Sequence, residues 1–121
     1  MKKKILLVDD KFEFRMLVKI ILADKYEVNS AEDGFEALAL LQTGYSPDII
    51  ISDLMMPQID GKAFVSHLKA SGLFSHIPVI ILSSIDKSYN KIELIEAGAK
   101  DYLIKPFNPR ELEIRIENQL N

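Results

Sequence analysis

Cysteine is absent from this sequence of 121 residues, and long apolar runs are absent too. Without cysteine the chain can form no disulfide framework, no thiolate metal site and no cysteine nucleophile. Such a composition suits a reducing compartment, and we expect a cytoplasmic protein. No run approaches the roughly 20 apolar residues of a membrane span. The apolar run after the basic start ends at Asp9 and Asp10, so we expect neither an export signal nor membrane binding.

An excess of basic residues is also lacking. The chain has 15 lysine and arginine residues against 18 aspartate and glutamate residues, a formal net charge of −3. Direct binding of nucleic acid usually needs a basic face, so we expect none here. With 48% hydrophobic and 27% charged residues, the chain is composed like one globular domain that can close its own core. We expect a single domain over residues 1–121.

The hydrophobic pattern alternates between two periods along the chain. Short apolar runs typical of strands occur at residues 4–8, 26–31, 47–53, 77–84 and 100–107. Apolar residues between and after these runs recur at the spacing of amphipathic helices, which we expect at 14–22, 35–42, 60–71, 86–98 and 108–120. Five repeats of strand and helix predict an α/β fold, with a parallel five-stranded sheet and helices on both faces.

Polar side chains stand at the ends of four of these predicted strands. Asp9 and Asp10 follow the first strand and Asp53 ends the third. Ser83 ends the fourth strand and Lys105 the fifth. Because the carboxyl ends of parallel strands share one edge of the sheet, where ligands bind in such folds, we expect these residues to lie together.

The chemistry of this set points to phosphoryl transfer. Three crowded carboxylates repel one another unless a divalent cation lies among them, and all-oxygen ligands favour Mg²⁺. An ammonium and a hydroxyl beside them suit the oxygens of a phosphoryl group, so Asp53 is predicted to be a nucleophile that forms an aspartyl phosphate. Each residue alone also fits an ordinary cap, turn or surface role, and the prediction depends on the whole set.

Five longer motifs cover nearly the whole chain: "ILLVDD", "PDIIISDLMMPQIDG", "PVIILSS", "EAGAKDYLIKPF" and "NPRELEIRIENQL". In content and order they resemble the receiver domain of two-component response regulators, including the stand-alone chemotaxis receiver. The resemblance implies a flavodoxin-like (βα)5 fold with a doubly wound sheet. It also implies a phosphorylation-operated switch in signal transduction rather than a metabolic enzyme, with self-catalysed phosphotransfer as its only chemistry.

By this resemblance, Mg²⁺ is held by Asp9, Asp10, Asp53 and the backbone carbonyl of Met55. Asp53 receives its phosphoryl group from a phosphohistidine on a sensor histidine kinase or phosphotransfer protein. Lys105 corresponds to the lysine that pairs with the phosphoryl group.

The resemblance also implies how the switch works. Ser83 corresponds to the hydroxyl that turns toward the phosphoryl group, and Tyr102 to the aromatic residue that then swings inward. The face made by the fourth helix, fifth strand and fifth helix would change as a result. The family usually has a cis peptide at the position of Lys105 and Pro106, and a cis bond before proline is the tolerable kind.

Two positions that flank the phosphorylation pocket in this family are apolar here, Met55 and Ile85. Neither side chain can orient a hydrolytic water, so we predict that the phosphoryl group is lost slowly. A half-life of seconds in Mg²⁺ would contradict this prediction. Ser83 also stands where threonine is commoner in the family.

Four charged residues resemble the pairs that many receivers use in a symmetric dimer: Lys91, Asp101, Glu111 and Arg115. Solvated charged faces explain them equally well, since a surface pair contributes only ~0–1 kcal/mol. Homodimerisation on phosphorylation is therefore a hypothesis.

Three other functions fit parts of the pattern. A Mg²⁺ phosphohydrolase of the dehalogenase type needs a second acid two residues after its nucleophile, where this chain has Met55, and a cap insertion that 121 residues do not allow. A flavin binder needs a phosphate loop after the first strand, where "VDDKFEF" is acidic. A degenerate receiver used as a scaffold would not need the full polar set. The sequence leaves open whether the chain stands alone or belongs to a larger regulator or hybrid kinase.

Overall fold

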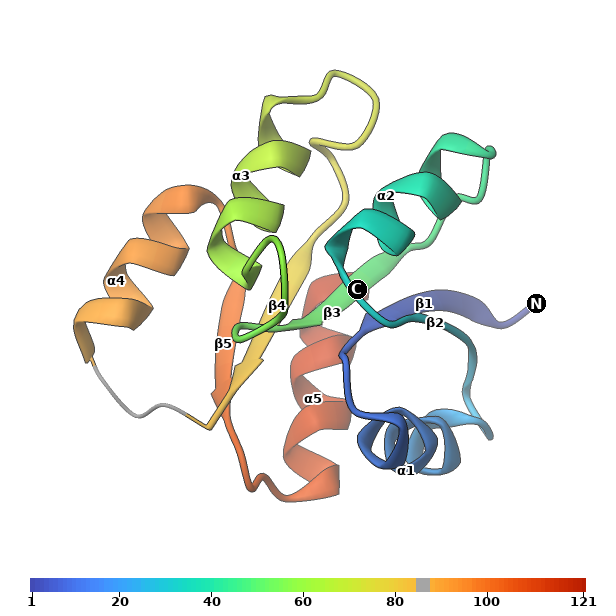
Figure 1. Ribbon diagram of the computed structural model, residues 1–121. Helices are drawn as coiled ribbons and strands as arrows, with labels where there is room; N and C mark the ends of the chain where they lie inside the picture. The colour runs from blue at the N-terminus through green and yellow to red at the C-terminus, as the bar shows by residue number, and fades with distance from the viewer. Residues whose placement is uncertain (85–87) are drawn as a thin grey trace.

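The computed structural model describes residues 1–84 and 88–121 and contains five strands alternating with five helices (Figure 1). In chain order they are β1 (Lys3–Val8), α1 (Phe12–Leu22), β2 (Tyr26–Ala31), α2 (Gly34–Gln42), β3 (Ile49–Asp53), α3 (Gly61–Ala70), β4 (Val79–Ser83), α4 (Ser88–Ala97), β5 (Asp101–Ile104) and α5 (Pro109–Leu120). The predicted start of α4, at residue 86, lies outside the described residues. None of the described helices is long and apolar enough to cross a membrane.

The five strands form one parallel sheet in the order β2-β1-β3-β4-β5. This is the flavodoxin-like order, so the predicted doubly wound α/β fold is confirmed. Helices α1 and α5 cover one face of the sheet, and α2, α3 and α4 cover the other (Figure 1). The strand order reverses between β1 and β3, which is where such folds bind ligands.

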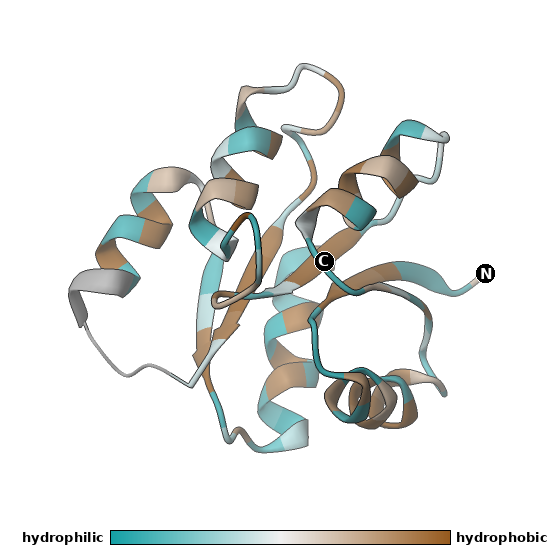
Figure 2. Ribbon diagram, viewed as in Figure 1, coloured by the Kyte–Doolittle hydropathy of each residue, from teal (hydrophilic) through white to brown (hydrophobic). Residues whose placement is uncertain are grey.

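Both faces of the central strands are buried, as their continuous apolar runs predict. In β1, Leu6 and Val8 pack on the α2–α4 side, whereas Ile5 and Leu7 pack on the α1 and α5 side. All four side chains are fully buried, and burial of each contributes roughly 1.5–3 kcal/mol. The hydrophobic colour concentrates in the strands, whereas the helices carry both colours (Figure 2). The sheet is thus a rigid base for whatever projects from its edge.

Side-chain caps define where several helices begin. Asp33 accepts a hydrogen bond from the backbone N–H of Glu36, and Asp60 accepts one from that of Ala63, both at 2.8 Å. Asn108 caps α5 and Pro109 is its first residue, as predicted. Helix α2 ends before Gly44, whose φ of +100° favours glycine.

The start of α3 presses directly on the backbone that follows β3. The N–H of Gly61 donates to the carbonyl of Leu54 at 2.7 Å. A β-carbon at Gly61 would lie 2.7 Å from the carbonyl oxygen of Asp53 and 2.8 Å from the α-carbon of Leu54. Only glycine fits this contact, which fixes the chain just beyond the end of β3.

Replacing Gly61 by alanine is therefore expected to lower the free energy of unfolding by about 1–3 kcal/mol, the usual cost of overpacking. Urea unfolding would measure the change. The matched control is Gly72→Ala, because no atom lies within 4 Å of the added β-carbon there. Equal stability of the two variants would contradict the contact, since alanine otherwise favours a helix.

Candidate functional site

The register of the sheet brings the predicted polar residues to one edge. Val8 lies opposite Ser52. The residue that follows each of them is an aspartate, so Asp9 and Asp53 lie side by side at the end of the sheet. Ser83, in turn, lies opposite Ile104. The polar residues at four strand ends therefore meet at the carboxyl edge, close to the switch point between β1 and β3.

Three carboxylates converge at this edge. One oxygen of each of Asp9, Asp10 and Asp53 lies within 4.8 Å of the others. Asp9 and Asp53 are 1% and 5% exposed, whereas Asp10 is exposed to solvent. Oxygen ligands in this number, buried on one side and open to water on the other, suit a hard divalent cation. The cluster could therefore hold a metal ion.

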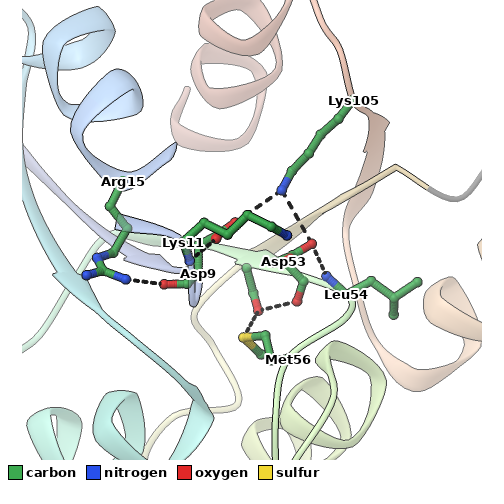
Figure 3. A network of polar contacts seen from close by, with 8 residues as sticks. Asp9, Lys11, Arg15, Asp53, Leu54, Met56 and Lys105 are labelled. Carbon is green, nitrogen blue, oxygen red and sulfur yellow. Dashed lines mark hydrogen bonds and ion pairs between the residues drawn. The ribbon is translucent and has the colours of Figure 1, made fainter. Parts of the chain in front are cut away.

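The ammonium of Lys105 lies between two of these carboxylates. Its Nζ is 3.1 Å from Oδ2 of Asp9 and 3.5 Å from Oδ1 of Asp53 (Figure 3). The backbone N–H of Lys105 donates to the carbonyl of Ser83 at 2.8 Å, and the Lys105–Pro106 peptide is cis. Because the ammonium balances part of the acidic charge, two carboxylates can be buried together here.

Burial raises the pKa of Asp53 above its ordinary value of 3.8, and repulsion from Asp9 adds to this. The ammonium of Lys105 lowers that pKa, as do a more distant charge on Lys11 and the backbone N–H of Leu54. This N–H donates to Oδ1 of Asp53 at 2.9 Å (Figure 3). Burial prevails, so the site without a metal disfavours the ionised carboxylate.

Sequence reasoning missed the side chains that hold this edge in place. The guanidinium of Arg15 donates to the backbone carbonyl of Asp9 at 2.7 Å, and the N–H of Lys11 donates to Oδ1 of Asp9 at 2.8 Å (Figure 3). The buried hydroxyl of Ser52 donates to the carbonyl of Asp53 at 3.0 Å and contacts the sulfur of Met56 at 3.9 Å. Of these residues, only Arg15 has a weak signal in the sequence. It lies near the start of the predicted first helix, six residues after Asp9, close enough in the chain to reach that loop.

The proposed switch residues lie close to this edge or behind it. Ser83 is fully buried at the end of β4, and Tyr102 is 5% exposed and packs in the core on the α2–α4 side. The structure gives one buried position for Tyr102, so its movement stays a prediction. Met55 is 59% exposed beside Asp53, whereas Ile85 lies outside the described residues.

Three of the four residues assigned to a dimer face pair within the chain. Arg115 donates to Asp101 at 2.7 Å and to Glu111 at 3.2 Å, joining β5 to α5. Lys91 is exposed on α4. The intrachain network gives these charges a structural role, and a dimer is not required to explain them.

Replacing Asp53 by asparagine tests the raised pKa, because the amide has a similar shape and does not ionise. In metal-free buffer, the folded wild-type protein binds a proton on Asp53 more tightly than the unfolded chain does, because the pKa is raised in the folded state. Its stability falls as the pH rises from 3.8 through the raised native pKa, a loss that the variant avoids. We expect Asp53→Asn to resist urea better at neutral pH, with the difference vanishing near the unfolded pKa. Equal urea midpoints at neutral pH would contradict this.

Comparison with known proteins agrees with this geometry. The family model described as "Response regulator receiver domain" matches residues 5–117. The chain is 41% identical over 120 residues to the "Probable transcriptional regulator ycf27" of Cyanophora paradoxa, covering 98% of this chain and 48% of the relative. It is 40% identical over 119 residues to "Histidine kinase P4" of Formosa agariphila, covering 98% of this chain and 9% of that protein.

Among solved structures, the chemotaxis response regulator CheY4 of Vibrio cholerae superimposes with a TM-score of 0.91 at 36% identity. The match covers 99% of this chain and 100% of that one. The first curated relative, in contrast, is about twice as long as the chain, which spans about half of it. A family match over nearly the whole chain and a shared fold lead to one conclusion. The chain belongs to the response regulator receiver domain family of two-component signalling.

Proposed function

We propose that residues 1–121 form one receiver domain that accepts a phosphoryl group on Asp53 in a Mg²⁺-dependent step. The convergence of Asp9, Asp10 and Asp53 with the ammonium of Lys105 carries this proposal. The donor would be a sensor histidine kinase or a phosphotransfer protein, in line with the kinases and regulators that the chain resembles. By composition the domain would work in the cytoplasm, without direct contact with a membrane or nucleic acid.

The carboxylate cluster fits Mg²⁺ as its metal. Asp9, Asp10, Asp53 and the backbone carbonyl of Met55 would hold the ion. When bound, it supplies positive charge that offsets the negative oxygens of the phosphoryl group. The buried Asp9 and Asp53 and the exposed Asp10 combine a fixed position with an open approach from solvent.

The reacting residue is Asp53, which β3 and the Gly61 contact hold rigidly. One carboxylate oxygen of Asp53 attacks phosphorus. The phosphorus–nitrogen bond of a phosphohistidine breaks, and its electron pair stays on the donor nitrogen. The oxygen is poised because Leu54 N–H and Lys105 fix the carboxylate, and positioning supplies much of the catalysis in phosphoryl transfer.

Lys105 and Ser83 would then bind the new group. The Asp53 carboxylate loses its own charge when the acyl phosphate forms, and the ammonium, 3.5 Å from it, can pair with a phosphoryl oxygen instead. Ser83 would turn its hydroxyl toward the phosphoryl group, and Tyr102 would follow inward. The charge change at the edge thereby biases a two-state element, the face made by α4, β5 and α5.

The same geometry disfavours a phosphohydrolase. Met55, two residues after Asp53, is apolar and largely exposed, so it supplies no acid and orients no water. The phosphoryl group is therefore expected to leave slowly, and the domain to act as a switch rather than as an enzyme that turns over.

The proposed function is tested by intact-mass spectrometry after incubation with acetyl phosphate, with and without Mg²⁺. We expect one phosphoryl group on the wild type, in the presence of Mg²⁺ only. Asp53→Asn serves as the matched control, because it keeps the size of the side chain and removes the nucleophile; it is expected to stay unmodified. Equal labelling of this variant would overturn Asp53 as the acceptor, and labelling without Mg²⁺ would overturn the metal requirement.

Homodimerisation through α4, β5 and α5 is proposed as the response to phosphorylation, and sedimentation velocity tests it. With Mg²⁺ and beryllofluoride, a mimic of the phosphoryl group, the chain is expected to sediment as a dimer, and without them as a monomer. Lys91→Glu is expected to weaken the dimer, because Lys91 is exposed on α4 and lies outside the Asp101–Arg115–Glu111 network. A monomer under both conditions would contradict the dimer.

A further inference from the structure

An aromatic ring lies against the ammonium of the acidic site. Phe14, in the first turn of α1, places its ring centroid 3.9 Å from Nζ of Lys105. The same Nζ contacts Asp9 at 3.1 Å and Asp53 at 3.5 Å. Among the described residues, the ammonium therefore contacts two carboxylates and one aromatic ring. The ring comes from α1, whereas the carboxylates come from the ends of β1 and β3.

A second aromatic residue supports the first. Phe107 contacts Phe14 edge to face, with ring centroids 6.1 Å apart and an interplanar angle of 89°. Both rings are partly buried and pack on the core of the α1 and α5 side. Phe107 follows Lys105 and Pro106 in the chain, so this pair joins α1 to the loop that carries the lysine. The ring of Phe14 thus has a fixed orientation toward Nζ.

The ring face carries partial negative charge and attracts an ammonium in this position. Unlike the attraction of the carboxylates, this attraction does not change during phosphoryl transfer. The carboxylate charge of Asp53 disappears when the acyl phosphate forms, and a metal ion at the cluster competes for both Asp9 and Asp53. The ring is unaffected by either change, so it keeps the ammonium at the site when the carboxylates no longer hold it.

We propose that Phe14 is a positioning residue for phosphoryl transfer, because its ring holds the Lys105 ammonium beside Asp53 throughout the reaction. The inference rests on the proposed function of Asp53 and adds a residue outside the polar set. Phe14 touches no reacting atom and acts through Lys105, while Phe107 keeps the ring in place.

The first test is the contact itself, measured without Mg²⁺ or phosphodonor. In a chain labelled with ¹³C-lysine, the ε-methylene protons of Lys105 are expected upfield of those of the other lysines, because their carbon is bonded to Nζ, which lies over the ring. The signal is assigned by its loss in Lys105→Met. Phe14→Leu is expected to remove the upfield shift and Phe14→Tyr to keep it. An unshifted signal in the wild type would overturn the contact.

The second test is the rate of phosphorylation by acetyl phosphate in Mg²⁺, followed by intact mass. Phe14→Leu is expected to slow labelling by about fivefold to thirtyfold, which corresponds to the loss of one well-formed cation–π contact. Phe14→Tyr is expected to restore the rate, because it keeps the ring face. Phe35→Leu is the matched control, since Phe35 is exposed on α2, on the other face of the sheet.

The outcomes separate the possible failures. Urea midpoints identify any loss of folding in Phe14→Leu, Phe14→Tyr and Phe35→Leu. If Phe14 has only a structural role, the phosphorylation rates of these variants will fall in proportion to their loss of stability. A wild-type rate for Phe14→Leu, or an equal loss for Phe14→Tyr, would overturn the positioning role. If the wild type takes up no phosphoryl group, the proposed function fails, and the lysine spectrum still decides whether the ring holds the ammonium.

Discussion

The ammonium of Lys105, placed between Asp9 and Asp53, is the interaction on which the rest of the site depends. Both carboxylates are almost completely buried, and an unpaired buried charge costs several kcal/mol or is neutralised. A single cation within 3.5 Å of both allows them to stand at the end of an apolar sheet. Burial and repulsion from Asp9 raise the pKa of Asp53 even so, so one ammonium does not fully offset the burial of two carboxylates. A divalent cation would supply the remainder.

The fold provides this arrangement through strand register and backbone contacts. Adjacent ends of β1 and β3 set the two aspartates side by side. The lysine comes from the end of β5, which lies two strands from β3 in the sheet. Gly61 holds the backbone after Asp53, and Arg15 holds the carbonyl of Asp9. Strands buried on both faces move little, so the acceptor is fixed. Changes on phosphorylation are therefore expected in the side chains and loops around it.

The fold could be predicted from the sequence because short apolar runs, typical of strands, alternate with the three-and-four spacing of apolar residues that is typical of helices. The ends of the elements shifted, and polar contacts explain the shift of the third strand. The third strand was expected from Pro47, yet β3 begins at Ile49, since proline has no N–H to donate and Asp48 binds the backbone of Lys4 through its side chain and N–H. The five polar residues of the site could also be predicted, because strand ends of a parallel sheet share an edge.

The contacts that support the site could not be predicted in this way. Phe14 lies in the range predicted as the first amphipathic helix. The spacing of apolar residues in that helix does not predict that its ring contacts the ammonium of Lys105, far along the chain. Ser52 follows three isoleucines, and nothing in that run predicts that its hydroxyl binds the carbonyl of Asp53. Such contacts depend on side-chain directions across elements, which spacing within one element does not encode.

Reductive trapping of the acyl phosphate tests the central claim most directly. Borohydride converts an aspartyl phosphate to homoserine, and peptide mass spectrometry then locates the modified residue. After treatment with acetyl phosphate and Mg²⁺, homoserine is expected at position 53 and at no other aspartate. Homoserine at Asp9 or Asp10, or at no position in a chain that carries a phosphoryl group, would contradict the assignment of Asp53 as the acceptor.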